Sequence, residues 1–157
     1  GTGTHETTSL CVKLMEKYIK KGDKVLDVGC GSGILSISAA LLGASKVLGL
    51  DIDQEAIRVS KENVQLNKVN ELVKIQHSNL VKGIDYEANL VMANLIDGLI
   101  KILNKEVTKN LLPGGIYISS GILIEKKAAV VADMENCGFK ILEIMEDGEW
   151  CAIASSM

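Results

Sequence analysis

The chain has 157 residues, of which 47% are hydrophobic and 24% are charged; this suffices for one compact domain with a packed core, and we expect no second domain. No apolar stretch approaches the roughly 20 uninterrupted residues of a membrane span, so we expect no membrane association. Seventeen basic against twenty acidic residues give a net charge of −3, which argues against a nucleic-acid binder that works by phosphate neutralisation.

Strand and helix patterns alternate along the chain. Short apolar runs predict strands over residues 24–28, 46–50, 72–77, 89–93, 116–120, 139–145 and 150–154. Apolar residues at helical spacing predict helices over residues 7–20, 34–42, 54–67, 96–110 and 125–137. Asp53 is expected to cap the third helix, and Pro113-Gly114-Gly115 is expected to form a turn. This alternation predicts an α/β fold with a mainly parallel sheet, helices on both faces and a C-terminal antiparallel hairpin.

The cysteines are widely spaced along the chain. They are Cys11, Cys30, Cys137 and Cys151. They form no Cys-x-x-Cys pair and have no nearby histidine that would complete a zinc set, so we expect no metal site. We interpret them as reduced, mostly buried thiols of a cytoplasmic protein.

Residues 27–33 read Asp-Val-Gly-Cys-Gly-Ser-Gly and directly follow the first predicted strand. Ligands of such sheets bind outside the carboxyl ends of the strands, so the residues after strands one, two and four are the informative ones. Gly29, Gly31 and Gly33 carry no Cβ that would obstruct a ligand. Asp51 stands 22 residues beyond Gly29, near the spacing at which an acid accepts hydrogen bonds from ribose hydroxyls. The pattern indicates an adenosine-containing ligand; a purely structural glycine turn is the alternative.

The glycine spacing argues against a dinucleotide. Dinucleotide-binding folds use Gly-x-Gly-x-x-Gly, and the third glycine of that motif would fall where this chain has Ile34. The acid at Asp27 suits the amino group of a methionine tail and would repel a pyrophosphate. The acid and the alternating glycines together resemble the first motif of class I S-adenosylmethionine-dependent methyltransferases.

Five segments in chain order carry a more particular resemblance. They are Gly-Thr-Gly-Thr-His-Glu-Thr-Thr at residues 1–8, the run 25–35, Leu-Asp-Ile-Asp at 50–53, Met-Ala-Asn-Leu at 92–95 and Ser-Gly-Ile-Leu at 120–123. Together they resemble the catalytic domain of the PrmA family, whose members methylate ribosomal protein eleven of the large subunit. The resemblance implies a Rossmann-like fold with a seven-stranded sheet, S-adenosylmethionine as the methyl donor and S-adenosylhomocysteine as the product. It also implies that an N-terminal substrate-recognition domain is absent from this chain.

The resemblance further implies a set of residues that bind the cofactor. They are Thr8, Asp27, Gly29, Gly31, Gly33, Asp51 and Asn94. Some of these residues have a plainer interpretation, since Thr8 or Thr7 can simply begin the first helix. Asp53 is a rival partner for the ribose, but the capping role explains it better, so we favour Asp51.

Asn94 and His5 are the candidate catalytic residues. Methyltransferases that act on amines place a polar residue after the fourth strand, often in the sequence Asn-Pro-Pro-Tyr. Leu95 follows Asn94 here, so nucleic-acid or glutamine methylation loses support, and capping of the next helix is the alternative role. His5 can line the substrate channel or accept a proton, because histidine exchanges a proton near neutral pH; a loop histidine without chemistry is the alternative.

The prediction is therefore a cytoplasmic protein-lysine methyltransferase domain whose partner is a ribosomal protein of the large subunit. No direct binding to nucleic acid or to a membrane is expected. A methyltransferase for an amine of another protein or of a small molecule would share every cofactor residue, and it is the alternative.

Overall fold

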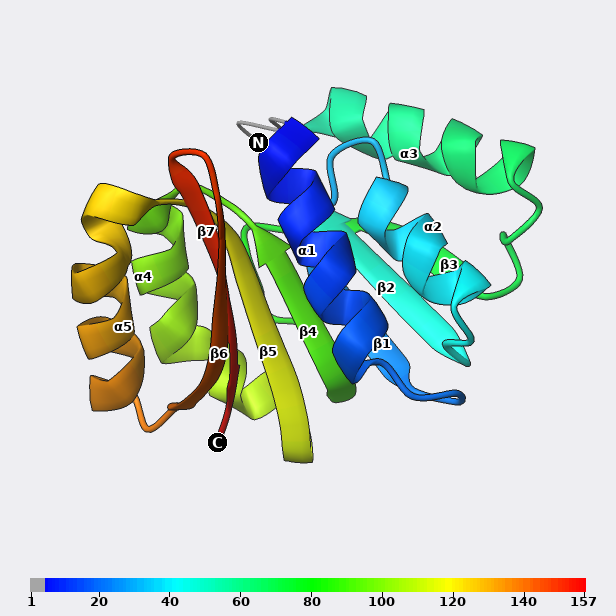
Figure 1. Ribbon diagram of the computed structural model, residues 1–157. Helices are drawn as coiled ribbons and strands as arrows, with labels where there is room; N and C mark the ends of the chain where they lie inside the picture. Colours follow the sequence, from blue (N-terminus) through cyan, green and yellow to red (C-terminus); the bar gives the residue numbers. More distant parts are fainter. Residues whose placement is uncertain (1–4) are drawn as a thin grey trace.

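The computed structural model describes residues 5–157, in which a seven-stranded sheet carries helices on both faces (Figure 1). The strands are β1 (Lys24–Val28), β2 (Lys46–Asp51), β3 (Val73–His77), β4 (Ala88–Asn94), β5 (Leu111–Leu123), β6 (Lys140–Asp147) and β7 (Trp150–Ser156). The helices are α1 (His5–Tyr18), α2 (Ile34–Leu41), α3 (Gln54–Leu66), α4 (Asp97–Glu106) and α5 (Lys127–Asn136), with 3-10 turns at Val107–Asn110 and Ile124–Lys126.

The strand order across the sheet is β3-β2-β1-β4-β5-β7-β6. Strands β1 to β5 pair in parallel, and β7 runs antiparallel between β5 and β6. The predicted α/β class, mainly parallel sheet and terminal hairpin are confirmed. The chain leaves β1 toward β2 and β3 on one side and returns to β4 and β5 on the other, so the strand order reverses at β1. Open α/β sheets bind their ligands at the carboxyl ends of the strands beside this point.

Each face of the sheet has its own apolar core. Helices α1, α2 and α3 cover one face, where α1 buries Leu14 and Met15, and helices α4 and α5 cover the other, where α4 buries Ile100 (Figure 1). Successive side chains of a strand point to opposite faces. Val25 accordingly packs in the core under α1 and α2, and Leu26 packs in the core under α4 and α5.

Two predicted elements differ from the structure. The helix predicted over residues 96–110 ends as an α-helix at Glu106 and continues as a 3-10 turn. The predicted turn Pro113-Gly114-Gly115 lies inside β5 as a bulge, because Ala88 pairs with Leu111 whereas Leu90 already pairs with Ile116. Pairing with β4 on both sides of the bulge keeps this segment within the strand.

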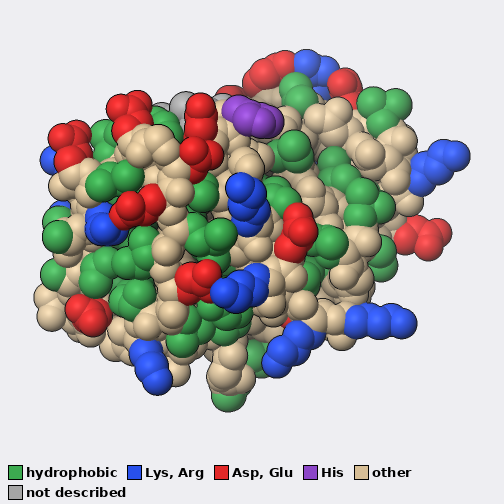
Figure 2. All heavy atoms as spheres, in the orientation of Figure 1, with side chains coloured by type: hydrophobic (Ala, Val, Ile, Leu, Met, Phe, Trp, Pro, Cys, Tyr) green, Lys and Arg blue, Asp and Glu red, His purple; other side chains and the backbone are tan. Residues whose placement is uncertain are grey.

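Charged side chains are unevenly spread over the surface. On the face seen in Figure 2, acidic side chains gather over α5 and the β6–β7 hairpin, and basic side chains lie mainly over α1 and below it. Lys17 of α1 forms an ion pair with Glu143 of β6 at 2.8 Å, so opposite charges meet where the two regions adjoin.

The cysteines are free thiols, and Cys11, Cys30 and Cys151 are buried. Burial is the main cause that raises the pKa of Cys30 to about 12, so this thiol stays neutral at physiological pH and packs as a small apolar group, as predicted. Within residues 5–157, no helix has both the length and the apolar character needed to cross a bilayer.

Candidate functional site

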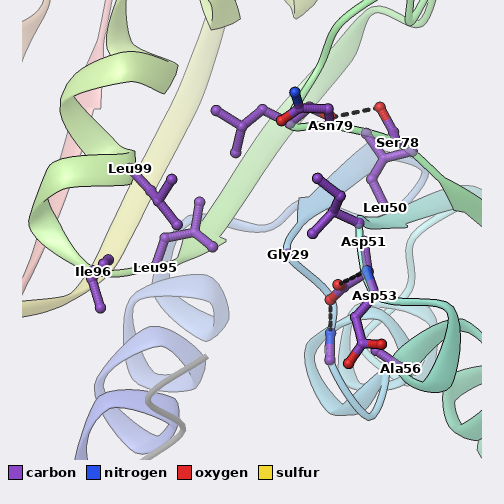
Figure 3. A pocket seen from close by; sticks show the side chains of 13 residues that line it. Gly29, Leu50, Asp51, Asp53, Ala56, Ser78, Asn79, Leu95, Ile96 and Leu99 are labelled. Carbon is purple, nitrogen blue, oxygen red and sulfur yellow. Dashed lines mark hydrogen bonds between the residues drawn. The ribbon is translucent and has the colours of Figure 1, made fainter.

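A cavity of about 510 Å³ opens at the carboxyl ends of β1 to β4, where the strand order reverses. Its walls come from the glycine loop after β1, the end of β2 with the start of α3, the segment after β3, and the start of α4. Figure 3 shows Leu95 and Leu99 on one side of this space and Asp51 and Ser78 on the other. Four loops that are distant in sequence thus surround one space at the switch point.

The glycine loop presents bare backbone to this cavity. Gly29, Gly31 and Gly33 have φ angles of 75°, 54° and 87°, in the left-handed region that favours glycine. A Cβ on Gly31 would meet no atom within 4 Å, so the loop is open toward a ligand there. A Cβ on Gly29 would lie 2.5 Å from Leu95 Cδ2, and a Cβ on Gly33 would lie 3.1 Å from Ser60 Cβ. Gly29 and Gly31 line the cavity, whereas Gly33 packs against α3.

Asp51 lies at the end of β2 and lines the cavity. Its Oδ2 accepts a hydrogen bond from the Gly31 N–H at 2.9 Å, and its Oδ1 accepts one from the Asp53 N–H at 2.9 Å (Figure 3). Each carboxylate oxygen has two lone pairs, so both can accept a further hydrogen bond from a hydroxyl. Asp51 therefore ties the glycine loop to β2 and keeps lone pairs that can accept hydrogen bonds from a ligand in the cavity.

Asp53 has the capping role that the sequence predicts. Its carboxylate accepts a hydrogen bond from the Glu55 N–H at 3.0 Å at the start of α3, which satisfies a backbone donor left free there. Asp53 also lines the cavity. One of its carboxylate oxygens is therefore already engaged at the start of α3.

Large apolar side chains stand exposed at the cavity. Ile52 is 61% exposed, Ile96 is 46% exposed and Leu99 is 37% exposed, and all three line it. Apolar groups that converge on a cleft containing a few fixed polar groups are typical of small-molecule sites. A flat purine would fit between such walls while its ribose meets Asp51, so the residues present fit an adenosine-containing cofactor.

The segment after β3 is a part of the site that sequence reasoning missed. Ser78, Asn79 and Leu80 line the cavity. The Ser78 hydroxyl donates a hydrogen bond to the Leu80 carbonyl at 2.8 Å, and Leu80 has a φ of 51°, which is uncommon for a residue with a side chain. The polar pair Ser78-Asn79 directly after a predicted strand could have indicated this segment. Ligands bind at the carboxyl ends of the parallel strands, and strand three is one of them.

A second group of predicted residues lies beside the cavity, where α1 begins over the ends of β4 and β5. The Ser120 hydroxyl donates to the Thr7 carbonyl at 2.8 Å, and the Asn94 Nδ2 donates to the Thr8 Oγ1 at 3.4 Å. Asn94 Oδ1 is buried and accepts no hydrogen bond from the described residues. A Cβ on Gly121 would lie 2.9 Å from that oxygen. The bare backbone at this glycine leaves room for the Asn94 side chain, which does not itself line the cavity but directly precedes Leu95, which does.

Five of the predicted residues do not line the cavity: His5, Thr8, Asp27, Gly33 and Asn94. His5 is exposed at the start of α1, and residues 1–4 of the motif lie outside the described part of the chain. Asp27 is fully buried, its Oδ2 accepts a hydrogen bond from the Ser36 hydroxyl at 2.7 Å, and its Oδ1 has no partner among the described residues. Burial is the main cause that raises the pKa of Asp27 to about 6; the hydrogen bonds from Ser36 lower it and the charge of Asp51 raises it.

Comparison with known proteins gives one family. The model of the family described as ribosomal protein L11 methyltransferase (PrmA) matches residues 1–157. Two curated relatives named ribosomal protein L11 methyltransferase, from the Clostridium botulinum strains Eklund 17B and Alaska E43, are each 47% identical to the chain over all 157 residues. The chain spans about half the length of these relatives, 50% of each.

Solved structures agree with this assignment. A crystal structure of a ribosomal protein L11 methylase from Lactobacillus delbrueckii subsp. bulgaricus superposes with a TM-score of 0.95 at 32% identity, over 98% of this chain and 80% of that one. A precorrin-6y C5,15-methyltransferase from Geobacter metallireducens has a TM-score of 0.80 at 15% identity, over 98% of this chain and 88% of that one, and it shares the fold. The chain belongs to the ribosomal protein L11 methyltransferase (PrmA) family.

Proposed function

We propose that this member of the PrmA family is the catalytic domain of an S-adenosylmethionine-dependent enzyme that methylates lysine amino groups of ribosomal protein L11. The observation that carries the proposal is the cavity at the switch point, where the open backbone of Gly31 meets the carboxylate of Asp51. The family and the methyltransferase fold imply a methyl donor of this type. The substrate is inferred from the relatives, which are named for that ribosomal protein.

The described residues suit each part of the cofactor. In the proposed arrangement, Asp51 accepts the ribose hydroxyls, Ile52 and Leu99 hold the adenine between them, and the methionine tail passes over Gly29 and Gly31. The proposed binding set is Thr8, Asp27, Gly29, Gly31, Gly33, Asp51 and Asn94. Bound S-adenosylmethionine supplies an activated methyl group for direct displacement by an amine, which leaves S-adenosylhomocysteine as the product.

Replacing Gly29 by alanine is expected to lower the affinity for S-adenosylmethionine about tenfold, because about 1–3 kcal/mol of backbone strain is added at a wall of the site. The new Cβ would lie 2.5 Å from Leu95 Cδ2 at a φ of 75°, so the loop or the Leu95 side chain must shift. Titration calorimetry measures the affinity. The control is Gly114→Ala in the β5 bulge, where φ is 76° and no atom lies within 4 Å of a Cβ. Equal affinity of the two variants would contradict the loop assignment.

The methyl acceptor must be a neutral amine. An unperturbed lysine ammonium has a pKa near 10.4, so about one in a thousand is neutral at physiological pH, equivalent to about 4 kcal/mol. The buried Asn94 Oδ1, which has no partner among the described residues, accepts an N–H of the neutral amine and turns its lone pair toward the methyl group. His5, exposed at the start of α1, is the proposed acceptor of the released proton. No strong base inside the site is needed, because the cationic cofactor itself favours the neutral amine.

Domain extent, substrate recognition and localisation are further parts of the proposal. We propose that the 157 residues form one catalytic domain, since the sheet that carries the site extends to β7 near the last residue. Recognition of the ribosomal protein is assigned to the part of the relatives that this chain does not span. Cytoplasmic localisation is proposed because the cysteines are free thiols. The absence of direct nucleic-acid binding stays a prediction from the net charge.

Transfer of a radiolabelled methyl group from S-adenosylmethionine to purified ribosomal protein L11 tests the proposal. The chain is compared with a longer protein that adds the half of the relatives lying outside the match. Labelled lysine in the ribosomal protein with only the longer protein supports both the substrate and the assignment of recognition, whereas equal transfer by this chain would contradict that assignment. Binding of S-adenosylmethionine without transfer by either protein would contradict the substrate and favour another amine.

A further inference from the structure

Asp27 is a buried carboxylic acid beneath the glycine loop, and the cavity wall does not account for it. It lies on β1 opposite Gly49 of β2, and none of its surface is exposed. Its Oδ2 accepts the hydrogen bond from Ser36, and its Oδ1 has no partner among the described residues. A buried carboxylate is costly unless it is fully hydrogen-bonded or paired with a charge. The free-energy cost of burying this carboxylate is therefore not offset by the contacts of Oδ1 among the described residues, which suggests a role beyond packing.

The surroundings of Asp27 admit the Ser36 hydroxyl, in addition to the Ser36 backbone, which also hydrogen-bonds the acid. A Cβ on Gly49 would lie 2.9 Å from Ser36 Oγ and 2.8 Å from Ile75 Cδ1, so the bare backbone of Gly49 makes the room in which the Ser36 hydroxyl reaches the acid. Ser36 lies in the first turn of α2, whose capping residue Gly33 provides no side-chain hydrogen bond. The positive end of the α2 dipole is close to the carboxylate and favours its charged form.

No basic side chain compensates the charge of Asp27 within residues 5–157. Among the described residues, its charged and titratable neighbours are Cys11 on α1, Cys30 in the loop and Asp51 at the end of β2. Burial raises the pKa of both thiols and keeps them neutral, and Asp51 has the same sign as Asp27. With its pKa raised to about 6, Asp27 is ionised at physiological pH. Asp27 is therefore a negative charge that no basic side chain among the described residues pairs with.

We propose that Asp27, acting through space from beneath the glycine loop, makes the site prefer the cationic cofactor over the neutral product. The inference rests on the proposed function. S-adenosylmethionine and S-adenosylhomocysteine share the adenosine and the amino-acid tail, and only the former carries a sulfonium charge. A fixed negative charge in a medium of low dielectric constant attracts the sulfonium and leaves the thioether unaffected. The direct contacts made by Asp51 and the glycines are common to both molecules and cannot discriminate between them.

The preference depends on pH in a defined direction. Protonation of Asp27 removes the negative charge, so the preference is present above about pH 6 and is lost as the pH falls through that value. Conversely, binding of the cationic molecule lowers the pKa of Asp27 and releases its proton to the solvent. Asp51 and Asp53 are the other carboxylates at the cavity. Both are unchanged in Asp27→Asn, so any attraction that they exert on the sulfonium is common to the two chains whose affinity ratios are compared.

Calorimetric titration of the chain with S-adenosylmethionine and with S-adenosylhomocysteine, from about pH 8 to about pH 5, measures the ratio of the two affinities. The ratio in the unchanged chain is expected to fall about fivefold over this range, and Asp27→Asn is expected to have the lower ratio throughout. Ser36→Ala keeps the carboxylate but removes the hydrogen bond from the Ser36 hydroxyl, so it should move the midpoint to higher pH. Asp147→Asn, which removes an exposed acid at the end of β6, is the control and should leave the ratio unchanged.

If the role of Asp27 is purely structural, Asp27→Asn would lose affinity for both molecules equally, and the ratio of the two affinities would stay constant. Equal ratios in Asp27→Asn and the unchanged chain at about pH 8, with both molecules bound, would overturn the inference and leave the proposed function intact. Failure of the unchanged chain to bind either molecule would overturn both. If circular dichroism finds Asp27→Asn unfolded, Ser36→Ala decides the question, since an unmoved midpoint contradicts the inference.

Discussion

Replacing Asp51 by alanine is expected to lower the affinity for S-adenosylmethionine about 100-fold. Two hydrogen bonds from the ribose hydroxyls to a carboxylate, each worth about 1.5 kcal/mol, would be lost. The loop would also loosen, because the Gly31 and Asp53 N–H groups lose the acceptor that each now bonds at 2.9 Å. Titration calorimetry measures the loss of affinity, and circular dichroism checks that the variant folds.

The matched control for Asp51 is Asp53→Ala. Asp53 lines the same cavity, but its carboxylate caps α3 through the Glu55 N–H. The control should therefore melt at a lower temperature and keep its affinity within about threefold. The opposite pattern, in which Asp53→Ala loses the affinity and Asp51→Ala retains it, would exchange the roles of the two acids.

Replacing Asn94 by alanine is expected to slow methyl transfer about 100-fold, the size of effect that misplacement of a reacting group produces. The variant loses the buried Oδ1 that has no partner among the described residues and that lies next to the bare backbone of Gly121. The affinity for S-adenosylmethionine should fall by much less than the rate, because Asp51 and the glycine loop are unchanged. Single-turnover transfer at saturating cofactor gives the rate, and calorimetry gives the affinity.

The control for Asn94 is Asn67→Ala. Asn67 follows α3 on the surface, where its side chain donates to the Asn63 carbonyl at 2.8 Å, so transfer should be unchanged. If Asn94→Ala lost affinity and rate to the same extent, the role of Asn94 would be limited to binding the cofactor, and the proposed orientation of the amine would be contradicted.

The sequence predicts the parts of this site that depend on local signals. The glycines at 29, 31 and 33 stand between a strand and a helix, and their left-handed backbone follows from their being glycine. Asp53 caps α3 because a short acidic side chain directly before an apolar helix does so in many contexts. The short apolar run of β1 likewise indicates a strand that is buried on both faces, since neighbouring side chains of a strand point to opposite sides.

The features that the sequence does not predict depend on contacts between distant segments. Ile96 and Leu99 have the spacing of core residues, yet they stand partly exposed at the cavity because no other element within residues 5–157 covers them. The bulge at Pro113–Gly115 is decided by pairing with β4, far away in the chain. Asp27 illustrates a third case, since its motif suggests a ligand contact but only the packing of α2 on β1 shows that it is buried.

The central claim is that the cavity lined by Gly31 and Asp51 is an S-adenosylmethionine site. Titration calorimetry of the chain with S-adenosylmethionine, and separately with nicotinamide adenine dinucleotide, tests it most directly. We predict one site per chain for S-adenosylmethionine, competed by S-adenosylhomocysteine, and no heat of binding with the dinucleotide. Binding of the dinucleotide, or no binding of S-adenosylmethionine by the folded chain, would contradict the claim.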